Sequence, residues 1–239
     1  MMQKITEIDV QPMCDEIDND LWEPTGDMVG HGSRNWVGSE IQTLIRHKTL
    51  FDCRRPEYGP CDFETPLDDL CLPDYCPTNT LFMYPEAIDT LVWFATTYGG
   101  KYARAMYYRT PPDTNVGVHL DAQPDSFNVG VMNNGVLSGK NGFYYKKDRY
   151  HVVIDGSYEY TVDHELEDKL YELPLNKKFQ KWPGEFMTLP VTKTFSKGEV
   201  WWFNNKRPHT SHNNGDIPKI NLVFDIDRSG ADNIPHIDP

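Results

Sequence analysis

The sequence predicts a mainly β fold, an antiparallel sandwich or jelly roll in which helices cover one sheet from outside. From residue 101 onward, short β-type segments alternate with turn signals, the pattern typical of such folds. Aromatic residues make up 13% of the chain, which suits strands and a lined pocket. A length of 239 residues is sufficient for one sizeable core.

The N-terminal part of the chain predicts helices. Residues 40–46 are expected to form a short helix, because Ser39 is a suitable N-cap. Residues 86–98 show apolar side chains at helical spacing, with Pro85 at the entry and Gly99-Gly100 at the exit. No domain boundary is evident. We expect a single domain over 1–239, with an N-terminal helical elaboration (1–100), a jelly-roll core (101–227) and a tail (228–239).

The predicted strands follow in close succession. Asp155-Gly156 is the strongest two-residue hairpin signal in the chain. The expected strands cover 103–108, 116–121, 127–132, 143–146, 150–154, 157–162, 186–189, 200–203 and 220–226.

Charge and hydropathy exclude some classes of partner. The formal net charge is −13 and the pI is near 5.0, which argues against nucleic acid as the main partner because phosphate binding needs clustered Lys and Arg. The N-terminal residues lack the apolar region of a signal peptide, and no run approaches the roughly 18 apolar residues of a membrane span. We therefore expect a cytoplasmic protein without membrane association.

The cysteine count is odd, which speaks against a complete disulfide framework. Cys53, Cys61, Cys71 and Cys76 lie close together in the sequence, so a thiolate zinc site is an alternative. These four cysteines lack the paired Cys-x-x-Cys spacing of zinc knuckles. Reduced, structural thiols are the expected state.

His119-Leu120-Asp121 is the only His-x-Asp in the sequence. Residues i and i+2 of a strand point to the same face, so His119 and Asp121 can reach one ion together. A second strand carrying His209 would add another imidazole. Two histidines and one carboxylate on one metal face leave coordination positions open, the arrangement found in non-haem Fe(II) oxygenases.

The segment around His209 has a recognisable order. Gly198-Glu199 precedes an apolar strand, Asn213 and Gly215 follow His209, and Lys219 stands ten residues after it. This pattern resembles the C-terminal part of 2-oxoglutarate/Fe(II)-dependent oxygenases, most closely the aspartyl/asparaginyl β-hydroxylase and proline hydroxylase branch. His209 fits the register of that pattern and His212 does not. The resemblance covers about residues 105–227, and residues 1–80 show none.

The resemblance implies a double-stranded β-helix and a set of site residues. His119, Asp121 and His209 would be the iron ligands, and Lys219 would pair with the distal carboxylate of 2-oxoglutarate. That branch usually has Arg at the position of Lys219, and Lys acts as a point charge where Arg offers a bidentate fork. The presence of Asp121, which the related halogenases lack, favours hydroxylation over halogenation.

Two further side chains are candidate contacts of the cosubstrate. Asn213 follows the second histidine in the pattern, with turn geometry as the alternative role. Arg109 could reach the cosubstrate from a neighbouring strand, as could Tyr107 and Tyr108, with core packing as the alternative.

The expected function is a dioxygenase that uses Fe(II), 2-oxoglutarate and O₂. It would hydroxylate an amino acid or a peptidyl side chain and release succinate and CO₂. The substrate would be a small molecule or a peptide. One alternative is a jelly-roll binding protein without redox chemistry, and another is a cupin-like metalloenzyme that does not use 2-oxoglutarate. The segments 122–126, 133–142 and 163–185, which would select the substrate, carry no recognisable motif.

Overall fold

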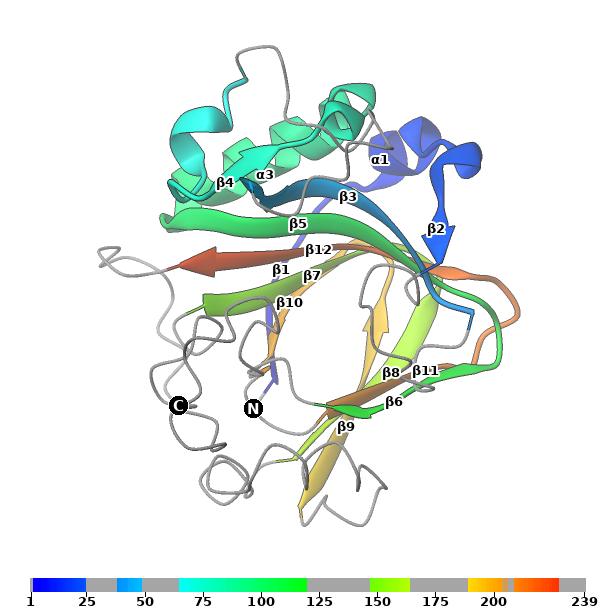
Figure 1. Cartoon of the computed structure of the whole chain (residues 1–239). Coiled ribbons are helices and arrows are strands. Elements are labelled where there is room, and N and C mark those ends of the chain that lie inside the picture. The colour runs from blue at the N-terminus through cyan, green and yellow to red at the C-terminus, as the bar shows by residue number, and fades with distance from the viewer. Residues whose placement is uncertain are drawn as a thin grey trace, which may run out of the picture.

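The computed structural model describes residues 2–24, 38–48, 65–119, 147–163, 189–203, 205 and 209–227. Its strands form two antiparallel sheets that face each other (Figure 1). The larger sheet has the order β1 (Met2–Glu7), β10 (Glu199–Phe203), β7 (Lys147–Asp155), β12 (Lys219–Asp227), β5 (Lys101–Thr110), β3 (Glu40–His47) and β2 (Glu23–Pro24), and β4 (Tyr75–Pro77) pairs with β3. The smaller sheet has the order β6 (Thr114–His119), β11 (His209–Asn213), β8 (Ser157–Asp163) and β9 (Pro190–Ser196).

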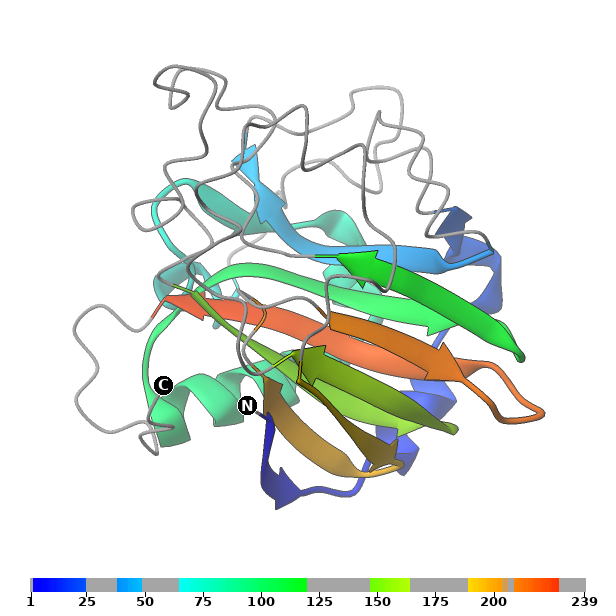
Figure 2. The same ribbon diagram turned by 90° about the horizontal axis from the view of Figure 1, so that it is seen from below.

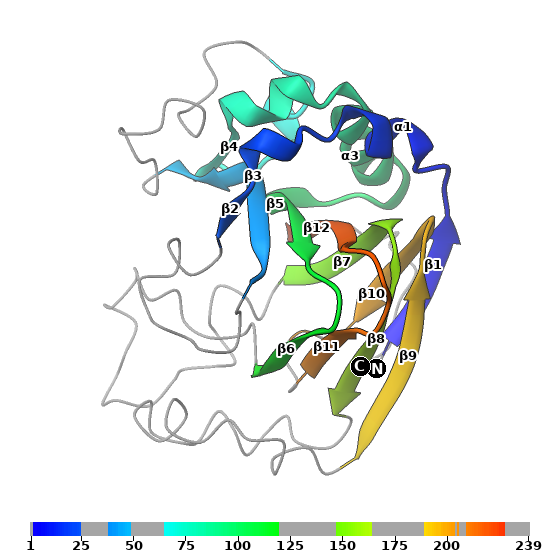
Figure 3. The ribbon, with the colours of Figure 1, turned by 90° about the vertical axis from the view of Figure 1, so that its right-hand side faces the viewer.

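The chain crosses repeatedly between the two sheets from β5 to β12. The larger sheet receives β5, β7, β10 and β12, while the smaller sheet receives β6, β8, β9 and β11. Figure 2 shows light-blue β3, green β5 and red-orange β12 side by side, and Figure 3 shows the two sheets facing each other. This winding makes a double-stranded β-helix and confirms the predicted mainly β fold.

Among the described residues, two α-helices cover the outer face of the larger sheet, as the sequence predicts. They are α1 (Gln11–Glu16) and α3 (Pro85–Tyr98), and the short 3-10 turns η1 (Asn19–Leu21), η5 (Asp68–Leu70) and η6 (Asn79–Met83) connect the surrounding segments. The predicted helix at 86–98 is confirmed. It begins at Pro85 and ends before Gly99, whose φ of 78° is readily adopted by glycine.

The N-terminus of α3 is capped by a side chain from another helix. Glu16 at the end of α1 accepts hydrogen bonds from the backbone N–H of Glu86 at 2.8 Å and of Ala87 at 2.9 Å. Its Oε1 also accepts a bond from the Tyr107 hydroxyl at 3.0 Å. Burial raises the pKa of the Glu16 carboxyl above its usual 4.5. One carboxylate therefore joins α1, α3 and β5.

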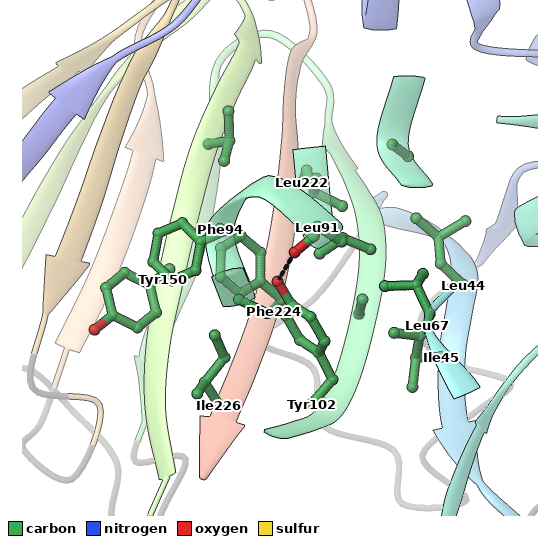
Figure 4. Close-up of a cluster of buried hydrophobic side chains, with 14 of the residues drawn as sticks. Leu44, Ile45, Leu67, Leu91, Phe94, Tyr102, Tyr150, Leu222, Phe224 and Ile226 are labelled. Atoms are coloured by element: carbon green, nitrogen blue, oxygen red, sulfur yellow. Dashed lines mark hydrogen bonds between the residues drawn. The ribbon is translucent and has the colours of Figure 1, made fainter. Parts of the chain in front are cut away.

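Aromatic and aliphatic side chains fill the space between α3 and the larger sheet (Figure 4). Phe94 of α3 packs edge-on against Tyr150 and Phe224, with ring centroids 4.7 and 4.8 Å away. The Tyr102 hydroxyl donates to the Leu91 carbonyl at 2.6 Å, so this buried polar atom is satisfied. This hydrophobic layer covers the outer face of the larger sheet, and the opposite face of the sheet points into the barrel interior.

The predicted helix at residues 40–46 is wrong, because this segment forms strand β3. The strand pairs with β5, and Ile41, Leu44 and Ile45 are buried on its two faces. A strand buried on both sides presents a nearly continuous apolar run, which periodicity alone does not separate from a short helix. The β-branched residues Ile41, Thr43 and Ile45 favour the strand.

Six of the predicted strands are found in the structure. The strands expected at 103–108, 116–121, 150–154, 157–162, 200–203 and 220–226 correspond to β5, β6, β7, β8, β10 and β12, and residues 120–121 of the second lie outside the described residues. Those expected at 127–132 and 143–146, and residues 186–188 of the one expected at 186–189, lie outside the described residues. Strands β1, β2, β4 and β9 were not predicted. In β9 only Phe195 is buried, so the segment lacks the alternation that identifies a half-buried strand.

The predicted hairpin at Asp155-Gly156 joins β7 to β8, and Gly156 has a φ of 73°.

Within the described segments, neither α-helix has the length and apolar character needed to cross a membrane.

Candidate active site

The inner face of the larger sheet carries side chains in successive rows. Residues directly opposite each other in neighbouring antiparallel strands share one face of the sheet. The rows run from the start of β12 toward its end: Thr110 and Lys219; Tyr108, Asn221 and Val153; Met106, Val223, His151 and Trp201; and Arg104, Asp225, Arg149 and Phe203. The first row lies by the turn between β11 and β12.

Lys219 is buried at the start of β12, with 1% of its surface exposed. Its ammonium donates a hydrogen bond to the Ser211 hydroxyl at 2.9 Å and lies 3.8 Å from the centroid of the Tyr158 ring. The ring of Tyr108 is 5.9 Å away. Within the described part of the chain, no carboxylate contacts this ammonium. Burial alone lowers the pKa of Lys219 from 10.5 to about 7.

The surrounding backbone holds Lys219 in place. A Cβ at Gly156 would lie 3.1 Å from both the Lys219 Cα and the Pro218 carbonyl oxygen, a tight approach that a larger side chain would crowd. Gly156 also has a positive φ, so two independent features require glycine there. The strongest hairpin signal in the sequence thus supports the start of β12.

Asn213, expected as a contact of the cosubstrate, uses its side chain for hydrogen bonds to the backbone around the β11–β12 turn. Its Nδ2 lies within hydrogen-bonding distance of the carbonyl oxygens of Thr110, Pro111 and Ile217, at 3.0, 3.0 and 2.9 Å. Its Oδ1 accepts from the Gly215 N–H at 3.2 Å. Asn213 is therefore a structural residue that joins the end of β5 to the β11–β12 turn, the alternative that the sequence left open.

The expectation for Arg109 is also corrected. Its Nε donates to Glu40 Oε2 at 2.7 Å, and its guanidinium lies 4.3 Å from the centroid of the Trp22 ring. Arg109 lies between Tyr108 and Thr110 in β5, and those two neighbours belong to the rows of the inner face. Strand alternation therefore places Arg109 on the outer face, away from Lys219.

His209 begins β11 and is fully buried in the barrel. Its ring packs against Tyr160 and Phe203, with centroid distances of 5.8 and 5.1 Å. His212 has an exposed side chain and lies 3.7 Å from the Asp113 carboxylate. The alternation of β11 thus places His209 inside and His212 outside.

Strand β6 brings the backbone of His119 directly opposite His209. The register shifts between these histidines and the next pair, Val116 and Ser211, so β6 has one additional residue there. The side chain of His119 and all of Asp121 lie outside the described residues. Among the residues that are described, no group of three or more His, Cys, Asp or Glu side chains is placed to hold a metal ion.

Lys219 and His209 are connected through Ser211. Ser211 lies two residues from His209 on the same buried side of β11, a separation of roughly 7 Å along a strand. The Lys219 ammonium and the His209 imidazole are therefore both buried in the barrel, one after the other along its length. Sequence reasoning did not identify Ser211 or Tyr158, although Ser211 stands at the i+2 position from His209.

Within the described segments, Cys14 and Cys71 are free thiols. Burial raises the pKa of Cys71 to about 12, which keeps this thiol protonated. Cys53 and Cys61 lie outside the described residues, so the alternative of a zinc site with four cysteines is not covered by the structure.

No family model matches this chain, and the comparison with curated proteins gives no match. Among solved structures, a conserved protein with a double-stranded β-helix domain from Klebsiella pneumoniae shares 10% identity at a TM-score of 0.29, over 54% of this chain and 70% of that chain. Oxalate decarboxylase from Bacillus subtilis shares 14% identity at a TM-score of 0.30, over 52% of this chain and 21% of that chain. The CENP-C cupin domain of Drosophila melanogaster shares 10% identity at a TM-score of 0.29, over 51% and 55%. Scores this low carry no argument about activity or ligand.

Proposed function

We propose that this protein is a 2-oxoglutarate- and Fe(II)-dependent dioxygenase that hydroxylates an amino acid or a peptidyl side chain. The observation that carries the proposal is the environment of Lys219. Its ammonium is buried on the inner face of a double-stranded β-helix, ten residues after a buried histidine, and no carboxylate of the described residues contacts it.

A buried ammonium is strongly destabilised unless an anion approaches it. A carboxylate that enters the barrel would restore the attraction lost with water, and Ser211 and Tyr108 offer hydroxyl groups in the same layer. Lys219 contacts Ser211, and His209 lies roughly 7 Å farther along β11, a span that suits a short dicarboxylate. 2-Oxoglutarate meets this requirement, because its distal carboxylate would pair with Lys219 while its keto-acid end lies toward His209.

The donors expected for the metal also fit Fe(II). Imidazole and carboxylate are both ligands that Fe(II) accepts, and three protein donors leave positions for a bidentate keto acid and O₂. His209 and His119 would supply imidazoles from paired strands, and Asp121 would supply the carboxylate. Bound Fe(II) would couple the conversion of 2-oxoglutarate and O₂ into succinate and CO₂ to insertion of the second oxygen atom into a substrate C–H bond.

The protein's own part is binding, orientation and exclusion of water. Tyr158, Tyr160 and Phe203 line the barrel interior, and Lys219 would orient the cosubstrate from the start of β12. His151 Nδ1 lies 3.0 Å from the Tyr158 hydroxyl, which holds the ring against the ammonium. An aromatic lining that excludes water would strengthen the charge–charge attraction at Lys219 and limit side reactions with water.

Two alternatives give different outcomes. A jelly-roll binding protein would take up an anion at Lys219 without consuming oxygen. A cupin-like metalloenzyme would bind metal through the histidines without requiring 2-oxoglutarate. The spacing of Lys219 from His209 favours the dioxygenase, because a metal site alone does not need this cation.

The test is a screen of iron-loaded protein for succinate formation and oxygen uptake with 2-oxoglutarate, in the presence of free amino acids and peptides. Succinate formation that depends on both iron and 2-oxoglutarate supports the proposal. Oxygen uptake without 2-oxoglutarate would indicate the cupin-like metalloenzyme, and anion binding without either product would indicate the binding protein.

A further inference from the structure

The side-chain nitrogen of Lys219 is enclosed by neutral groups. Lys219 is 1% exposed, and its nitrogen lies 2.9 Å from the Ser211 hydroxyl and 3.8 Å from the centroid of the Tyr158 ring. The ring of Tyr108 is 5.9 Å away. In the described part of the chain, the titratable groups that face this nitrogen are therefore two phenols, and no carboxylate is among its contacts. Such surroundings favour the neutral amine over the ammonium, because burial removes the hydration of the charge without supplying a counter-ion.

This environment separates Lys219 from ordinary lysines by its protonation state. Burial lowers the pKa of Lys219 from 10.5 to about 7. At about pH 8, an amine with that pKa is roughly nine-tenths neutral, whereas an ordinary lysine is neutral in roughly one molecule of three hundred. Only the neutral amine has the lone pair that attacks an electrophile. Lys219 therefore combines an enclosed position with a nucleophilic nitrogen.

Hydrogen-bond donors lie next to Lys219 on the inner face of the larger sheet. Thr110 stands directly opposite Lys219 in β5, and Asn221 lies two residues farther along the same face of β12. Both side chains are fully buried, and among the described residues neither the Thr110 hydroxyl nor the Asn221 amide forms a hydrogen bond of ordinary geometry. Burial raises the pKa of the Tyr158 hydroxyl, and the neighbouring Asn221 amide opposes that rise. Buried polar groups without a partner are uncommon, so these two groups are placed to donate to an anion that forms beside them.

We propose that Lys219 is a site of reversible carbamate formation with CO₂. The amine nitrogen forms a bond to the carbon of CO₂, one C=O electron pair moves onto oxygen, and the nitrogen releases a proton. The neutral amine thus becomes an anionic carbamate without any oxidant or cofactor. Ser211 Oγ, 2.9 Å from the nitrogen, is placed to accept the released proton while its own hydroxyl hydrogen moves on. The Ser211 and Thr110 hydroxyls and the Asn221 amide then stabilise the carbamate oxygens as donors.

The carbamate reverses the charge at the start of β12. A cation that attracts a carboxylate is replaced by an anion that repels one, so CO₂ and a carboxylate ligand compete for Lys219. Under the proposed function, CO₂ is released in the same barrel, and its accumulation slows binding of the next 2-oxoglutarate. This consequence rests on the proposed function, whereas formation of the carbamate does not.

The experiment equilibrates full-length protein with isotopically labelled bicarbonate, which supplies CO₂, at about pH 6 and about pH 8. Carbon NMR detects the carbamate. A trialkyloxonium salt then converts it into a stable ester, whose position is found by peptide mass spectrometry. Wild type is compared with Lys219→Arg, whose guanidinium stays charged and forms no carbamate. Lys193→Arg is the matched control, because Lys193 is exposed on β9.

We expect a single carbamate per wild-type chain at the higher pH, located at Lys219, and much less at the lower pH, where the amine is protonated. The signal should be absent from Lys219→Arg and unchanged in Lys193→Arg. Ser211→Ala should lower the occupancy at limiting CO₂ by roughly two- to tenfold, because one donor is lost. An unchanged occupancy would overturn the part assigned to Ser211.

Mapping of the ester in wild type decides the inference even if a variant fails to fold. No carbamate at Lys219 in wild type at the higher pH would overturn it, as would an equal signal in folded Lys219→Arg. Bicarbonate should also weaken the binding of 2-oxoglutarate to metal-loaded wild type. A carbamate at Lys219 in a protein that does not bind 2-oxoglutarate would contradict the proposed function and leave the carbamate site standing.

Discussion

The ammonium of Lys219 lies 2.9 Å from the hydroxyl of Ser211, which is two residues from His209 on the buried side of β11. This contact connects the cation expected to hold 2-oxoglutarate with the strand that carries one expected iron ligand. Lys219 belongs to β12 of the larger sheet and Ser211 to β11 of the smaller sheet, so the contact spans the space between the two sheets. It marks the end of the candidate site that lies by the β11–β12 turn.

Replacing Lys219 by Met should stabilise the free protein and abolish its response to 2-oxoglutarate. A pKa lowered from 10.5 to about 7 corresponds to a burial penalty of up to roughly 5 kcal/mol, which Met does not incur. The unfolded chain binds more protons between these two values, so this penalty diminishes as pH rises from about 7 to 10.5. Thermal unfolding should show a higher Tm for Lys219→Met than for wild type, and 2-oxoglutarate should raise only the wild-type Tm. A lower Tm for the variant would mean that Lys219 has an anionic partner in the free protein.

The affinity for 2-oxoglutarate should decrease as pH rises above about 7. Below that value Lys219 is already protonated, and above it the neutral amine must take up a proton before it can pair with a carboxylate. The decrease should reach up to about tenfold per pH unit. Calorimetry in two buffers with different ionisation enthalpies would measure the proton taken up. A pH dependence that persists unchanged in Lys219→Met would assign the effect to another group.

His209→Ala should abolish metal binding, and His212→Ala should leave it intact. His209 is buried in the barrel beside Tyr160 and Phe203, while His212 is exposed on the opposite face of the same strand. The two variants remove the same side chain from positions three residues apart, so each controls for the other. Metal content after dialysis against Fe(II) or Mn(II) measures the difference. Loss of metal in His212→Ala with retention in His209→Ala would show that the register is wrong.

Glu16→Ala should destabilise the fold by about 1–3 kcal/mol, because three donors lose a partly buried acceptor. These donors are the N–H groups of Glu86 and Ala87 and the hydroxyl of Tyr107. Glu86→Ala is the control, since it keeps the backbone N–H groups and removes an exposed carboxylate from the same helix turn. Chemical denaturation measures both variants, and equal stabilities would contradict the proposed role of Glu16 as a cap.

The sequence predicts those parts of the fold in which local pattern and tertiary environment agree. The helix at 86–98 has apolar spacing, Pro85 at its start and glycine at its end, and the hairpin at Asp155-Gly156 needs a positive φ. Residues 40–46 were misassigned because both faces of β3 are buried, which depends on helices and strands distant in the sequence. Strand β9 escaped prediction because most of its side chains are exposed.

For the candidate site, the sequence predicts Lys219 and His209, both of which are buried in the barrel, but it misplaces two neighbours. The spacing between His209 and Lys219 can be read from the sequence itself, so this prediction does not depend on knowledge of the fold. The faces of Arg109 and Asn213 depend on strand register and on the path of the β11–β12 turn, which no spacing reveals. Ser211 and Tyr158 became apparent only when the two sheets were brought together around the ammonium.

The most direct test of the central claim is an anaerobic calorimetric titration of metal-loaded protein with 2-oxoglutarate, comparing wild type with Lys219→Met. We expect one equivalent to bind wild type, and affinity to fall by roughly ten- to a hundredfold in the variant, because one charge-assisted hydrogen bond to a carboxylate is lost. Metal content should be the same in both proteins. Equal 2-oxoglutarate affinity in the two proteins, or no binding to metal-loaded wild type, would contradict the assignment of Lys219 as the anchor of the cosubstrate.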